Sequence, residues 1–194
     1  MTRFTFTLAL VVTSSVLLSG CIGPVLIAGA ATGATVAHDR RTSGTIMEDK
    51  AIQLKAEHEM RDNVALKKDA HVVFTSYNNN VLIVGQVPSH DVSSKIEEMV
   101  QNIPEVKKVY NELEVGPPIS MTTISHDSWI TTKIKSSSLY GRAGVDPLRT
   151  KVVTEDSVVY LMGIVSHAEA DNATELARKV EGVERVVRVF EYTD

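Results

Sequence analysis

Hydrophobic and polar residues follow the same pattern twice along this chain. Three blocks of the first half recur in the same order, 77 or 78 residues later. The blocks and their counterparts are 49–52 with 127–130, 81–87 with 159–165, and 106–109 with 183–186. This agreement in order and spacing predicts two tandem domains of about 70 residues, a size that is small but able to fold. A break at Gly116-Pro117-Pro118 divides them into 46–116 and 117–194.

Each copy is predicted to fold in the order αββαβ. The first helix carries apolar residues at i, i+4 spacing, and an aspartate, Asp49 or Asp127, is placed to cap it. Strands, hairpin turns and a second helix follow, which makes the fold class α+β. The elements after the first helix are expected at 72–75, 78–80, 81–87, 89–102 and 106–115, and at 151–154, 155–157, 159–165, 167–180 and 183–192.

Gly85 and Gly163 interrupt the aliphatic strands of the two copies. A lone glycine inside a strand marks a close approach of two backbones, or a bulge, more often than a phosphate-binding loop. We therefore expect these glycines to serve the packing of the strands.

The first twenty residues have the features of a secretory signal. Arg3 gives a positive start, and residues 4–18 are apolar with small polar interruptions, carry no charge and are short for a transmembrane helix. The sequence Leu-Ser-Gly-Cys at 18–21 resembles the lipobox of bacterial lipoproteins at all four positions. The resemblance implies that residues 1–20 are removed and that Cys21 is acylated on its sulfur and on its new amine. The alternative is a free cysteine in a cleavable signal or in an uncleaved anchor.

Residues 21–45 are expected to form a flexible tether, because small residues dominate them and show little periodicity. Arg40 and Arg41 are interpreted as a solvated pair, with contact to anionic headgroups as the alternative. Ile22 stands where an aspartate commonly retains lipoproteins in the inner membrane. The resemblance therefore implies anchoring to the periplasmic face of the outer membrane.

The composition excludes several classes of function. Of 194 residues, 43% are hydrophobic and 23% are charged, and the net charge is −4. A mildly acidic chain lacks the basic excess that steers proteins to nucleic acid. Mean hydropathy near zero argues against a polytopic membrane protein and a disordered chain alike. Cys21 is the single cysteine, so no internal disulfide forms.

No residue pattern indicates catalysis. The sequence contains no nucleophile elbow and no Walker sequence, and its histidines show no metal-ligand spacing. We therefore expect no enzyme, no catalytic residue, no metal and no cofactor. The histidines are His38, His58, His71, His90, His126 and His167.

Trp129 is the only tryptophan, and Ala51 occupies its place in the first copy. At about 100° per residue, Ile130 and Ile134 define the core face of this helix, and Trp129 lies on another face. An indole among threonines and lysines suits a membrane interface, with the ring at headgroup level. The alternative is that Trp129 covers a contact between the domains or a gap in its own core. The residues that share or extend this face are Thr132, Lys133, Lys135, Ser136, Leu139, Tyr140 and Arg142.

The closing sequence Val-Lys-Lys-Val-Tyr-Asn-Glu-Leu at 106–113, the element order and the glycine in the aliphatic strand resemble the BON domain family. The second copy departs from the closing motif at Arg188 and Phe190. Over residues 46–194, the resemblance implies two helices on one face of a three-stranded mixed sheet, and no catalysis. It further implies that the second domain binds anionic phospholipid, such as phosphatidylglycerol, through its tryptophan helix. It also implies a role in envelope integrity. Because a tethered domain needs only modest affinity for lipid, we expect the protein to accumulate where anionic lipid is enriched, as at the division site.

A protein-interaction adaptor is the alternative function. The face that carries Trp129, or an exposed sheet edge, would then dock a periplasmic or outer-membrane partner. Family association suggests the β-barrel assembly machinery as that partner.

Overall fold

The computed structural model describes residues 39–136 and 149–194. Cys21 and most of the expected tether lie outside the described residues, as do Leu139, Tyr140 and Arg142. No helix in the described ranges is long and apolar enough to span a bilayer.

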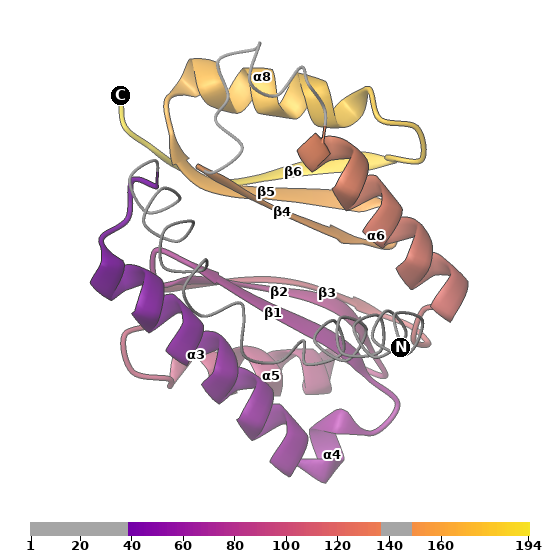
Figure 1. Cartoon of the computed structure of the whole chain (residues 1–194). Helices are drawn as coiled ribbons and strands as arrows, with labels where there is room; N and C mark the ends of the chain where they lie inside the picture. Colours follow the sequence, from indigo (N-terminus) through magenta and orange to yellow (C-terminus); the bar gives the residue numbers. More distant parts are fainter. Residues whose placement is uncertain (1–38, 137–148) are drawn as a thin grey trace, which may run out of the picture. The chain divides into compact units, whose positions relative to one another are not determined.

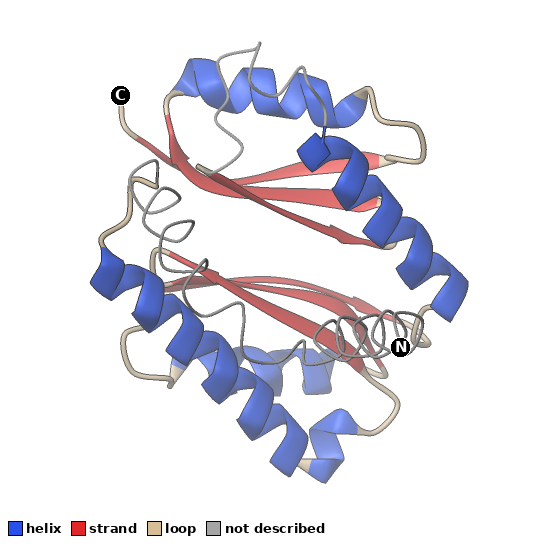
Figure 2. Ribbon diagram, in the orientation of Figure 1, coloured by secondary structure: helices blue, strands red, loops and turns tan. Residues whose placement is uncertain are grey.

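Each half of the described chain folds as an α+β unit with a three-stranded sheet, as predicted (Figures 1 and 2). In each sheet the middle strand pairs antiparallel with the first strand and parallel with the last. The first half contains α3 (Ser43–Asp62), α4 (Val64–Lys67), β1 (His71–Tyr77), β2 (Asn80–Val87), α5 (His90–Gln101) and β3 (Lys108–Val115). The second half contains α6 (Met121–Ser136), β4 (Thr150–Glu155), β5 (Val158–Val165), α8 (His167–Arg178) and β6 (Arg185–Tyr192).

The long helices of each half cover one face of their own sheet. In Figure 1, α3 and α5 lie on one face of β1–β3, and α6 and α8 lie on one face of β4–β6. Apolar side chains between helices and sheet form a separate core in each half. Ile52 and Ala56 of α3 and Ile130 and Ile134 of α6 are at most 2% exposed, which confirms the predicted core face of both helices.

The opposite faces of the two sheets share a third apolar cluster. Because strand side chains alternate between faces, the aliphatic middle strands supply both their own core and this cluster. Gln86 Nε2 donates to Glu155 Oε1 at 3.1 Å, and the Tyr77 hydroxyl donates to the Arg149 carbonyl at 3.1 Å. The cluster contains Tyr77, Leu82 and Val84 from the first half and Val158, Tyr160, Met162 and Val189 from the second.

The predicted helix-capping role of Asp49 and Asp127 is wrong. Both residues lie inside helices, since α3 begins at Ser43 and α6 at Met121. Their side chains are 4% and 5% exposed and accept hydrogen bonds from the backbone of the hairpin turns. A carboxylate can satisfy two orphan N–H groups at a turn as well as at a helix start. The sequence pattern alone does not distinguish these two uses.

The glycines of the middle strands allow the close backbone approach that was predicted. A Cβ at Gly85 would lie 2.0 Å from the His71 carbonyl oxygen, and the φ of Gly85 is +125°. A Cβ at Gly163 would lie 2.7 Å from the carbonyl oxygen of Arg149. Both glycines therefore let the first strand pair closely with the middle strand.

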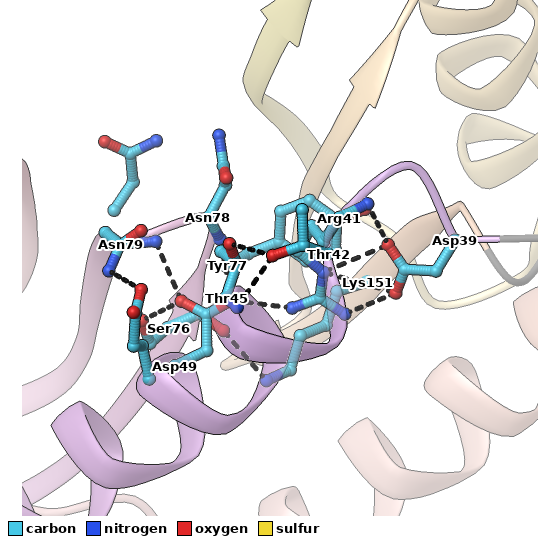
Figure 3. A network of polar contacts seen from close by, with 12 residues as sticks. Asp39, Arg41, Thr42, Thr45, Asp49, Ser76, Tyr77, Asn78, Asn79 and Lys151 are labelled. Atoms are coloured by element: carbon cyan, nitrogen blue, oxygen red, sulfur yellow. Dashed lines mark hydrogen bonds and ion pairs between the residues drawn. The ribbon is translucent and has the colours of Figure 1, made fainter. Parts of the chain in front are cut away.

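The expectation of a solvated Arg40–Arg41 pair is also wrong. Arg41 is 13% exposed, and its guanidinium bonds to Asp39 at 2.6 Å and to Asp49 at 2.7 Å (Figure 3). The same guanidinium lies 3.8 Å from the centre of the Tyr77 ring. Arg40 donates to Glu169 at 2.8 Å and to the Ile164 carbonyl at 2.7 Å. The arginines therefore hold residues 39–41 against the folded domains.

Candidate functional site

Helix α6 presents the face predicted to meet a membrane, and contacts on its other side fix that face outward. Ile130 and Ile134 are buried in the core of the second half. The Thr131 hydroxyl lies 2.7 Å from the Thr154 hydroxyl on β4. The Asp127 carboxylate accepts from the turn that joins β4 to β5. Apolar packing and hydrogen bonds thus set the rotation of the helix about its axis.

Trp129 lies on the outward face of α6, with 40% of its surface exposed. It belongs neither to the apolar cluster between the sheets nor to the core of the second half. Both structural alternatives, a cover for the domain contact and a filler of the core, therefore lose their support.

Two side chains with basic groups flank the Trp129 ring. The His126 ring stacks on it, with centroids 5.6 Å apart and an interplanar angle of 20°. The Lys133 ammonium lies 5.4 Å from the centre of the indole. These residues come from the turns before and after Trp129, so the indole lies between an imidazole and an ammonium. A cation at this distance is attracted to the face of an indole.

The other described residues of the predicted site divide into two groups. Thr132 and Ser136 are exposed near Trp129, and their hydroxyls donate to backbone carbonyls of α6. Lys135 is exposed but lies about 120° around the helix axis from Trp129. Burial and then the charge of Arg41 lower the pKa of Lys151 on β4, and the charge of Lys135 adds to this effect. The structure therefore groups Trp129, Thr132, Lys133 and Ser136 and places Lys135 beside them.

Charge distinguishes α6 from its counterpart α3. Lys133 and Lys135 are exposed in the last turns of α6, and its single carboxylate, Asp127, is buried. Helix α3 exposes lysines and carboxylates together along its length, and Ala51 stands where α6 has Trp129. Only α6 thus combines an exposed indole with an excess of positive charge.

His126 is the residue of this face that the sequence analysis missed. Its spacing of three residues from Trp129 places the two on neighbouring positions of a helix surface, which was an available signal. The pair His126-Asp127 indicated only a helix cap at Asp127, and no role was expected for the His126 ring. Among the described residues, no group of three side chains could hold a metal ion.

Comparison with known proteins identifies the family. The BON domain model matches residues 48–117 and again 126–194. The chain is 38% identical over 187 residues to the outer membrane lipoprotein DolP of Haemophilus influenzae, covering 96% of both chains.

Two further relatives share a smaller part of the chain. A 21 kDa hemolysin of Actinobacillus pleuropneumoniae is 36% identical over 154 residues, 79% of either chain. The osmotically-inducible protein Y of Escherichia coli is 30% identical over 146 residues, which cover 74% of this chain and 72% of that protein. The two matches to the family model cover most of residues 48–194, and the DolP relative, an outer membrane lipoprotein, aligns over 96% of the chain. This chain therefore belongs to the BON domain family and is a lipid-anchored protein of the outer membrane.

Proposed function

We propose that this protein is tethered through acylated Cys21 and maintains envelope integrity by binding anionic phospholipid through α6. The observation that carries the proposal is the exposed Trp129 ring with the Lys133 ammonium 5.4 Å from its centre. No exposed carboxylate of α6 opposes the two lysines. The ligand we assign is a lipid of the phosphatidylglycerol type, whose headgroup carries one negative charge.

The physical basis is a division of roles between ring and charges. An indole is most stable at headgroup level, where its apolar body is shielded and its N–H meets water. Each lysine near an anionic surface contributes about 1 kcal/mol. That sum is modest, but a tethered domain meets the membrane at high effective concentration. Such a site responds to lipid composition, and enrichment of anionic lipid at the division site would concentrate the protein there.

The test uses the compact unit 38–194, without its acyl groups, and vesicles with or without phosphatidylglycerol. Trp129→Glu places a negative charge at the centre of the face, and we expect binding to anionic vesicles to weaken by about tenfold or more. Leu54→Glu is the matched control, because Leu54 is 51% exposed on α3. Backbone amide shifts should move along α6 when anionic vesicles are added.

Two outcomes would overturn the proposal. Equal loss of binding in Trp129→Glu and Leu54→Glu would show that overall charge, and not this face, governs attachment. Vesicle binding unchanged by Trp129→Glu, with loss of envelope integrity in cells carrying that variant, would assign the face to a protein partner. The β-barrel assembly machinery would then be the first partner to test.

A further inference from the structure

His126 occupies a defined place on the outward face of α6. Its ring stacks on Trp129 on one side. On another side it meets Gly182 in the loop between α8 and β6, where a Cβ would lie 2.5 Å from His126 Nε2. Gly182 has a φ of +87°, a conformation that suits glycine. The imidazole is therefore held against the indole by both a ring contact and the backbone of a neighbouring loop.

The charged groups of the two elements that meet at His126 are few. On α6 they are Lys133, beyond the indole, Lys135, about 120° around the helix axis from Trp129, and Asp127, which is engaged by the β4–β5 turn. The loop from α8 to β6 carries Lys179, Glu181 and Glu184. Within the described ranges, His126 forms neither a hydrogen bond nor an ion pair. Its side chain is thus exposed beside Trp129 and lies against Gly182 without a hydrogen bond to the described residues.

We propose that His126 makes the phospholipid-binding face of α6 responsive to pH. This inference rests on the proposed function. A histidine side chain gains a positive charge between about pH 8 and pH 5. Protonation of His126 would add a cation one turn before Trp129 on α6, whereas the Lys133 ammonium comes from the turn after it. The phosphodiester of phosphatidylglycerol keeps its negative charge over this range, so the change in attraction arises on the protein.

The size of the effect follows from the charge that is added. One further cation at an anionic surface tightens binding by about fivefold. Attachment to anionic vesicles should therefore be about fivefold tighter at pH 5.5 than at pH 7.5. Vesicles of phosphatidylcholine alone should show no such difference.

Three variants of the unit 38–194 test the assignment on vesicles with phosphatidylglycerol. His126→Gln should bind with the same affinity at pH 5.5 and at pH 7.5. His126→Lys should bind at pH 7.5 as tightly as the unsubstituted protein does at pH 5.5. His90→Gln is the control, because His90 is an exposed histidine on α5, in the other half. It should keep the full pH response.

Trp129 supplies a readout that needs no lipid. An imidazolium in contact with an indole quenches its fluorescence, and Trp129 is the single tryptophan. Emission should fall on acidification in the unsubstituted protein and in a Glu181→Gln, Glu184→Gln double variant. His126→Gln should abolish that fall.

The two proposals fail separately. Binding to anionic vesicles that depends on Trp129 but has the same pH response in His126→Gln would overturn the role of His126 and leave the lipid function intact. Absence of binding at either pH, with fluorescence quenching still present, would overturn the lipid function and with it the assigned role of the imidazole. Loss of the pH response in His90→Gln to the same extent as in His126→Gln would show that the response follows the net charge of the protein and not His126.

Discussion

At the scale of single residues, Asp49 and Asp127 show how one side chain orders a turn distant in sequence. Both hairpin turns have two consecutive residues at positive φ, as the two central residues of a type I′ turn require. Asp127 accepts from the N–H groups of Asp156 and Ser157 at 2.9 Å each. Each helix thus fastens the tip of the hairpin that follows it.

Removing these carboxylates should destabilise the protein to different degrees. Asp127→Ala leaves two turn N–H groups without an acceptor, which should lower the free energy of unfolding by about 1–3 kcal/mol. Asp49→Ala should cost more, because Asp49 also accepts from Ser76 and pairs with Arg41. Urea denaturation measures both values. Asp62→Ala, at an exposed position, is the control and should change stability by less than about 0.5 kcal/mol. Equal effects of all three substitutions would contradict the role of the turns.

At the scale of elements, residues 39–41 connect the start of α3 to both halves of the described chain. Arg41 pairs with Asp39 and Asp49 and lies over Tyr77, in the first half. Arg40 bonds to Glu169 of α8, in the second half. Adjacent arginines thus serve different domains, and the chain is held in place before α3 begins.

Arg41→Ala should loosen this connection. The substitution leaves the buried Asp49 without its cation, and we expect a loss of about 1–3 kcal/mol in the free energy of unfolding. Amide hydrogen exchange of residues 40–46 should accelerate in the variant. Arg178→Ala, which breaks an exposed pair with Glu175, is the comparison and should leave both measurements nearly unchanged. Unaltered exchange in Arg41→Ala would show that the start of α3 is held by other contacts.

At the scale of the whole described unit, the contact between the two sheets holds a partly buried lysine. Lys151 donates to the Ser76 carbonyl at 3.3 Å, across the two halves. Burial, and then the charge of Arg41, lower the pKa of Lys151 from its ordinary value of 10.5 to about 8. Between pH 8 and 10.5, the unfolded chain therefore binds a proton that the native protein lacks. Stability rises with pH wherever the unfolded state binds more protons.

Lys151→Met should remove this rise. Relative to the variant, the unsubstituted protein should gain roughly 1 to 2 kcal/mol of unfolding free energy between pH 7.5 and 9.5. Denaturant titrations at several pH values measure the difference. Parallel profiles of the two proteins would contradict the prediction. Above pH 10 both should lose stability, because burial raises the pKa of Tyr77 and Tyr160 to about 12 and their unfolded forms ionise first.

Much of the fold follows from local pattern. The repeat, the order of elements and the core faces of α3 and α6 were predicted correctly, because alternation, i, i+4 spacing and turn residues act over a few positions. The hairpin turns were predicted at 78–80 and 155–157, and the structure places them at 78–79 and 156–157. The hydrogen-bonding roles of Asp49 and Asp127 were not predicted correctly. A short polar side chain before an apolar stretch is compatible with a helix cap and also with a hydrogen bond to a distant turn. Only the position of the hairpin decides between them.

The candidate site divides in the same way. The sequence by itself determined that Trp129 and Lys133 share a helix face away from the core, because helical geometry places i and i+4 together. Only the tertiary structure decided that the indole stays exposed, that His126 is held against it by Gly182, and that Arg41 is buried beside Tyr77. These outcomes depend on segments 36 to 56 residues apart in the chain. Exposure and long-range contact are properties of packing, which local periodicity does not encode.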